Sequence, residues 1–165
     1  MKALILFFFS ISSFSLFARD ELNMHEFKVL GEALIEVTLF KIDVYTAKLY
    51  QSNSLKNVTV LELDYMIDVD KKYSLQGWKE GFKPINQAKY KAAIDWIFEN
   101  TIDLNKGDKF SIWKSKNEVR FYHNLKLVAQ IKDPFVNQIA LYPWIGENPL
   151  DQEMKNKLLG LNKEK

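Results

Sequence analysis

The chain has 165 residues, 27% of them charged and 47% hydrophobic, a length and composition typical of one globular domain. Its 23 basic and 21 acidic residues leave a formal net charge of +2 without a dense Lys/Arg cluster, so we expect no nucleic-acid partner. The absence of cysteine excludes disulfides, a thiolate nucleophile and cysteine-ligated zinc. With only His25 and His123, neither in a ligand-like cluster, we also expect no metal site and no cofactor.

Residues 1–18 are predicted to be a cleaved signal peptide. Lys2 precedes a short apolar run, and the segment ends at the small residue Ala18, which is the pattern of a secretory signal. A retained membrane anchor is the alternative, but the segment holds four serines and is followed by charge at Arg19, whereas a span needs about 20 apolar residues. We expect cleavage after Ala18 and a single mature domain, residues 19–165, in the periplasm or secreted.

The longest β-like run covers residues 31–50, after a short first strand predicted at Phe27–Leu30. Its apolar residues change face at about Phe40 and again at Tyr45. Because side chains alternate strictly along a strand, such a change needs a bulge or a bend. We predict two strand segments joined at about Phe40–Asp43, with a plain hairpin corner as the alternative. Bends often re-aim side chains toward a site, so a pocket is expected to include residues near Tyr45.

The rest of the chain alternates between strand and helix patterns. A clean period of two predicts a strand from Thr59 to Asp70. Ser74 is expected to cap a helix that Pro84 ends, and a second helix is expected at about Asn86–Asn100. Further elements are predicted as strands at Phe110–Lys114, Glu118–His123 and Leu127–Ile131, then helices after the caps Asp133-Pro134 and Asn148-Pro149, the last ending at Gly160. This order predicts an α+β fold, a large antiparallel sheet with helices on one face.

Three stretches stand out by their order and spacing. They are Gly31-Glu32-Ala33 leading into residues 42–50, then Arg120-Phe121-Tyr122-His123-Asn124, then Trp144-Ile145-Gly146 before Leu158-Leu159-Gly160. Together they resemble the bacterial, exported branch of the chalcone isomerase-like family over about residues 27–160. The resemblance implies an open-faced sandwich with a ligand cleft between the sheet and its helices.

The resemblance also implies where a site would lie. The plant isomerases of this family use an arginine and a threonine on the bent strand to polarise a flavonoid. Matching residues 46–50 to the strand end puts the threonine position at Tyr45 and the arginine position near Ala33 or Leu34, where this chain has no arginine. Loss of that cation forfeits roughly 3–4 kcal/mol of transition-state stabilisation. We therefore expect no catalytic residues, with an intramolecular lyase of the isomerase type as the alternative.

The preferred hypothesis is a non-catalytic domain that binds a small amphipathic or lipid-like ligand. In fatty-acid-binding relatives an arginine and a tyrosine hold the carboxylate. Tyr45 matches that tyrosine, and because the arginine is unmatched a neutral or amphipathic ligand fits better than a free fatty acid. The expected ligand-binding residues are Tyr45 as donor, Trp78, Phe82 and Tyr90 as apolar walls, and Arg120 if its side chain reaches the cleft.

Two other classes of function remain open at this point. An enzyme would have His123 as its general base, although the chain has no Gly-x-Ser-x-Gly nucleophile motif. A structural or partner-binding module of the cell envelope would use an exposed strand edge or the C-terminal helix.

Overall fold

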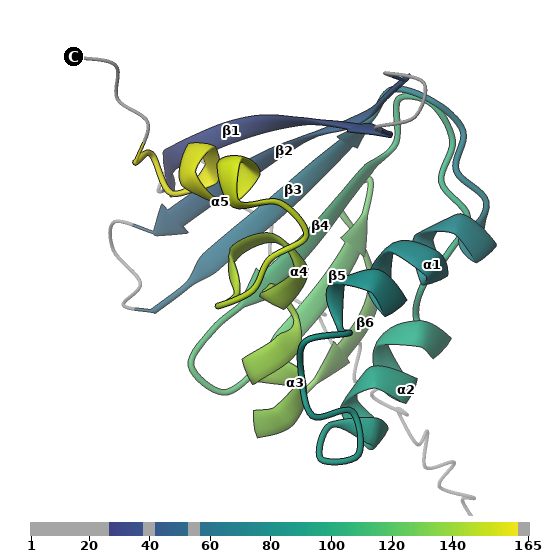
Figure 1. The fold of residues 1–165 in the computed structure, drawn as a ribbon, viewed down its shortest axis with the longest axis vertical. Coiled ribbons are helices and arrows are strands. Elements are labelled where there is room, and N and C mark those ends of the chain that lie inside the picture. Colours follow the sequence, from purple (N-terminus) through teal and green to yellow (C-terminus); the bar gives the residue numbers. More distant parts are fainter. Residues whose placement is uncertain (1–26, 38–41, 53–56, 162–165) are drawn as a thin grey trace, which may run out of the picture.

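The computed structural model describes residues 27–37, 42–52 and 57–161 (Figure 1). Within them the strands form one six-stranded antiparallel sheet whose spatial order is the order of the chain. The strands are β1 (Phe27–Val37), β2 (Ile42–Ser52), β3 (Thr59–Tyr65), β4 (Lys109–Lys114), β5 (Val119–His123) and β6 (Lys126–Ile131). The helices are α1 (Lys71–Gly81), α2 (Lys91–Glu99), α3 (Pro134–Ile139), α4 (Tyr142–Ile145) and α5 (Gln152–Leu158).

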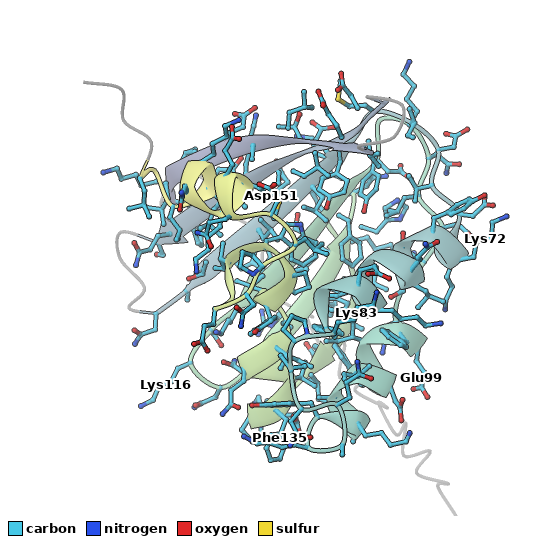
Figure 2. All side chains as sticks on the ribbon, viewed as in Figure 1. Lys72, Lys83, Glu99, Lys116, Phe135 and Asp151 are labelled. Carbon is cyan, nitrogen blue, oxygen red and sulfur yellow. The ribbon has the colours of Figure 1, made fainter. Side chains whose placement is uncertain are left out.

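The helices cover one face of the sheet, as Figure 1 shows, which confirms the predicted α+β open-faced sandwich. Side chains of the central strands that face the helices are almost fully buried. They include Ala47, Leu49, Leu61, Leu63 and Ile112, each no more than 3% exposed. Charged residues such as Lys72 and Lys116 project outward into solvent (Figure 2). None of the described helices is both long and apolar enough to cross a membrane, and the expected signal peptide, residues 1–18, lies outside the described residues.

The predicted bent strand over residues 31–50 is two strands of a hairpin. β1 and β2 run antiparallel and pair with each other, so the first change of phase, at about Phe40, is the passage from one strand to the next. The second change, at Tyr45, coincides with a register shift: Ile35 pairs with Tyr45 and Glu36 with Asp43, which leaves Val44 as the extra residue of a bulge. Of the expected joint at Phe40–Asp43, residues 40 and 41 lie outside the described part of the chain, and the other two belong to β2. Phe27–Leu30 is not a separate strand, because β1 continues through Gly31 with a register shift there.

α1 begins earlier than predicted. Asp70, not Ser74, occupies the N-cap position, so Ser74 lies inside the helix. The backbone N–H of Lys71 donates to the Asp103 carboxylate at 2.6 Å, and this partner from a distant part of the chain satisfies a group that the helix start leaves free. α2 begins at Lys91 rather than at Asn86, which instead accepts a hydrogen bond in a preceding turn.

The C-terminal helices follow the predicted local signals more closely. The Asp133 carboxylate accepts from two backbone N–H groups of the first turn of α3, and Pro134 is its first residue, as expected. α5 is capped by Asp151 rather than by Asn148. Gly160 has φ +65°, the conformation that ends a helix at a glycine. The short helix α4 was not predicted.

α5 docks on β1 through a close approach of two backbones. A Cβ on Gly31 would lie 1.9 Å from the carbonyl oxygen of Lys157 and 2.7 Å from that of Leu158. A Cβ on Gly160 would lie 2.6 Å from the carbonyl oxygen of Leu30. Both positions therefore require glycine, and the two residues together fix the end of α5 against the first strand.

Candidate functional site

A cavity of about 180 Å³ lies between the sheet and the helices. Strands β2, β3 and β4 form one side, and α1 and α4 form the other. Rings dominate the wall, including those of Tyr45, Tyr65, Trp78, Phe110 and Trp144. Such an apolar, aromatic pocket with a few polar groups is the usual form of a small-molecule site.

Tyr45 links the sheet side of the wall to α4. Its ring is 5.2 Å from that of Tyr65, and its hydroxyl accepts a hydrogen bond from Nε1 of Trp144 at 3.1 Å. Removal from water raises the pKa of Tyr45 to about 12, although the Trp144 hydrogen bond acts in the opposite direction. Burial, and secondarily the nearby Tyr45, also raise the pKa of Tyr65 well above its ordinary value. Both phenols are therefore neutral hydrogen-bond donors at physiological pH.

Ser74 adds an aliphatic hydroxyl to the phenol hydroxyls of the cavity wall. It lines the wall from α1, and its Oγ is buried without a hydrogen-bond partner among the described residues. Thr101, another lining residue, instead donates its hydroxyl to the carbonyl of Ile97 at 2.8 Å. Because buried polar atoms are nearly always paired, the Ser74 hydroxyl calls for an explanation.

The wall is uncharged. Among the described residues that line the cavity, none is Lys, Arg, His, Asp or Glu. The described residues also contain no group of three or more His, Cys, Asp or Glu side chains placed to hold a metal ion.

Two of the expected ligand-binding residues, Tyr45 and Trp78, line the cavity, and two expected wall residues do not. Phe82 is 1% exposed and stacks on Trp78 at 5.3 Å between ring centroids, behind the wall. Tyr90 lies between α2 and α3, where its hydroxyl donates to Gln138 at 2.8 Å and its ring meets that of Phe135 at 5.7 Å.

Arg120 lies on the other face of the sheet. It alternates along β5 with Phe121, whose ring packs on Trp96 of α2, so the two side chains point to opposite faces. Its guanidinium forms an ion pair with Glu118 at 2.8 Å and hydrogen-bonds Tyr122. Arg120 therefore does not reach the cavity.

His123, the candidate general base, does not line the cavity, although it is the cross-strand partner of the wall residue Phe110. It lies at the end of β5, with Nε2 2.9 Å from the Asp108 carboxylate. The same carboxylate accepts hydrogen bonds from the Asn124 amide and from the backbone N–H of Asn105. This cluster ties the β5 turn to the loop that enters β4.

Several wall residues were not singled out from the sequence. Tyr65 shares the inward face of its strand with Leu61 and Leu63, a signal in the alternation that could have identified it. Trp144 was noted only as part of a family-like stretch. Ser74 was interpreted as a helix cap, and this hid its place in the wall.

The fold is therefore an open-faced α+β sandwich with an internal pocket between its sheet and its helices. The chain belongs to the chalcone isomerase-like family, whose model matches residues 21–160. Among solved structures the chain is similar to a fatty-acid binding protein of Arabidopsis thaliana. The two are 13% identical with a TM-score of 0.65, over 82% of this chain and 88% of that chain. At this identity the likeness shows a shared fold. A comparison with curated protein sequences gave no match.

Proposed function

We propose that this protein is a non-catalytic carrier or receptor domain that holds a small hydrophobic or amphipathic molecule in the cavity beneath α1 and α4. The observation that carries this proposal is the aromatic cavity of about 180 Å³ with hydroxyl groups in its wall. The similar Arabidopsis structure is that of a fatty-acid binding protein, which supports a binding role for the same fold.

The size of the cavity limits what it encloses. An apolar cavity of about 150 Å³ holds one benzene ring, so this one accommodates a single substituted ring or a short alkyl chain. Tyr73 and Leu150 line the cavity yet are 58% and 47% exposed, so they mark its opening. A longer ligand would extend into solvent between them.

The character of the wall supports binding over catalysis. An isomerase of this family develops negative charge on its substrate, and a cation or preorganised donors must stabilise that charge. The described wall has no cation, and Tyr45 and Tyr65 are neutral phenols with raised pKa values. We propose that the pocket stabilises a neutral bound molecule.

We also propose that the protein acts outside the cytoplasm. The support is the sequence of residues 1–18, with Lys2, an apolar core and Ala18 at its end. N-terminal sequencing of the protein recovered from its own cells would test this, because cleavage after Ala18 leaves Arg19 as the first residue.

Titration with small aromatic and alkyl compounds tests the binding role, because Trp78 and Trp144 line the cavity and report occupancy through their emission. Val44→Phe adds a ring to the wall and should weaken binding at least 10-fold. Val128→Phe makes the same change at an exposed position of β6 and should leave binding unchanged. The proposal fails if no compound binds or if Val44→Phe binds as well as the wild type. Turnover of a chalcone that is lost in Tyr45→Phe would contradict the non-catalytic role.

A further inference from the structure

We infer that the cavity selects an uncharged ligand bearing a hydroxyl group, such as a simple phenol, and that Ser74 together with Tyr45 hydrogen-bonds that hydroxyl. This inference rests on the proposed binding function and specifies its ligand class and its selecting residues. It excludes ligands that would place a carboxylate inside the cavity.

Ser74 supplies the first step of the argument. Its Oγ is buried without a partner among the described residues, although the residue lines the cavity. Rotation about one side-chain bond moves a serine hydroxyl between staggered positions at little cost. A ligand hydroxyl in the cavity would give Ser74 the hydrogen bond that the protein itself does not provide.

Tyr45 supplies the complementary group. Its oxygen already accepts from Trp144, while its own proton is donated to no described residue. A ligand oxygen can accept that proton, and removal from water keeps the phenol protonated. A hydroxyl group both accepts and donates, so in a cavity this small one ligand hydroxyl can accept from Tyr45 and donate to Ser74.

Because the wall is uncharged, the cavity should favour neutral ligands over charged ones. A carboxylate would leave water for a wall whose described residues include no Lys, Arg or His. Burial of an unpaired ion costs far more than one or two hydrogen bonds return. The Arg120 guanidinium, on the other face of the sheet, does not relieve this cost.

Three compounds of similar shape separate these contributions at pH 7.5: toluene, p-cresol and 4-methylbenzoate, titrated into the intact protein and followed by NMR chemical shifts. We expect p-cresol to bind about 10-fold more tightly than toluene, since two hydrogen bonds are gained. We expect 4-methylbenzoate to bind at least 100-fold more weakly than p-cresol. If none of the three binds, the proposed function fails. If 4-methylbenzoate binds as tightly as p-cresol, the proposed function stands and the inference falls.

Ser74→Ala tests the assigned residue. We expect p-cresol affinity to fall about 3- to 10-fold with toluene affinity unchanged. The ligand-free variant should be at least as stable as the wild type, because the change removes an unpaired buried hydroxyl from a helix. Ser115→Ala is the matched control, since it removes a serine hydroxyl that donates to the Glu118 carbonyl and does not line the cavity, and it should leave the ratio of p-cresol to toluene affinity unchanged. An unchanged ratio in Ser74→Ala would overturn the inference.

Discussion

Gly31→Ala tests the backbone contact that joins β1 to α5. The added Cβ would lie 1.9 Å from the Lys157 carbonyl oxygen, whereas an ordinary contact begins at 3.4 Å. The obstructing atom is backbone, which cannot swing aside as a long side chain would. Relief of the clash therefore requires α5 to move away from the first strand.

The cost of that movement can be bounded. Overpacking of a well-packed site costs about 1–3 kcal/mol, and occasionally more. α5 also buries Met154 and Leu158, at 8% and 0% exposure, and displacement would return part of that apolar surface to water at about 25 cal/mol per Å². We expect Gly31→Ala to destabilise the protein by about 3 kcal/mol.

Gly77→Ala is the matched comparison, because it is the same chemical change in a setting with room for it. Gly77 lies inside α1, and a Cβ there would meet nothing within 4 Å. Glycine within a helix is destabilising by about 0.5–1 kcal/mol relative to alanine, so this variant should gain that much. Gly31→Ala should lower the free energy of unfolding and Gly77→Ala should raise it, so that the two variants differ from each other by about 4 kcal/mol.

Urea unfolding of the wild type and both variants measures these differences as changes in midpoint at constant slope. Amide hydrogen exchange locates the damage, and in Gly31→Ala the loss of protection should concentrate in α5. A Gly31→Ala midpoint equal to that of the wild type would refute the close approach. A Gly77→Ala variant that is less stable than the wild type would refute the open space at that position.

Three further predictions concern single interactions. Trp144→Phe removes the donor to the Tyr45 hydroxyl and should cost about 1–3 kcal/mol in urea unfolding, and a midpoint unchanged from wild type would contradict the bond. Asp133→Ala removes the cap of α3 and should cost about 1–2 kcal/mol, while Asp133→Asn should retain most of it. The pKa of Asp108 is held far below its ordinary value, first by the backbone N–H of Asn105. The ionised Asp108 carboxylate therefore stabilises the folded protein fully above the unfolded pKa of about 4, and this stabilisation is lost as the pH falls toward the lower folded pKa. Asp108→Asn should accordingly weaken the dependence of the unfolding free energy on pH below about 4.

Local signals made much of the fold predictable. The Asp133-Pro134 cap lies within one turn of the groups that it satisfies, so the sequence pattern contains the whole interaction. Gly160 is likewise predictable, because a positive φ at a helix end is a local demand that glycine meets. The change of phase near Phe40 was less informative, because a bulge within one strand and a hairpin between two strands produce the same pattern of faces.

The candidate site depended on contacts that no local pattern contains. Tyr45 was predicted from its place in the strand, but its partner Trp144 comes from a short helix late in the chain. Ser74 was assigned to a cap because serine favours that position, whereas the Asp103 carboxylate, from the far side of α2, binds the first N–H of α1. The misplaced helix start therefore concealed the unpaired Ser74 hydroxyl in the cavity wall.

The sheet order has a consequence for how the pocket forms during folding. Each strand pairs with its neighbour in the chain, but α1 and α2 lie between β3 and β4, so this pairing joins segments far apart in sequence. The cavity wall takes Tyr45 and Leu63 from one side of that seam and Phe110 from the other. Because closing a long loop is slow compared with forming adjacent hairpins, the pocket should form only when the two halves of the sheet join. In stopped-flow refolding, competence to bind should accordingly arrive with the slowest phase.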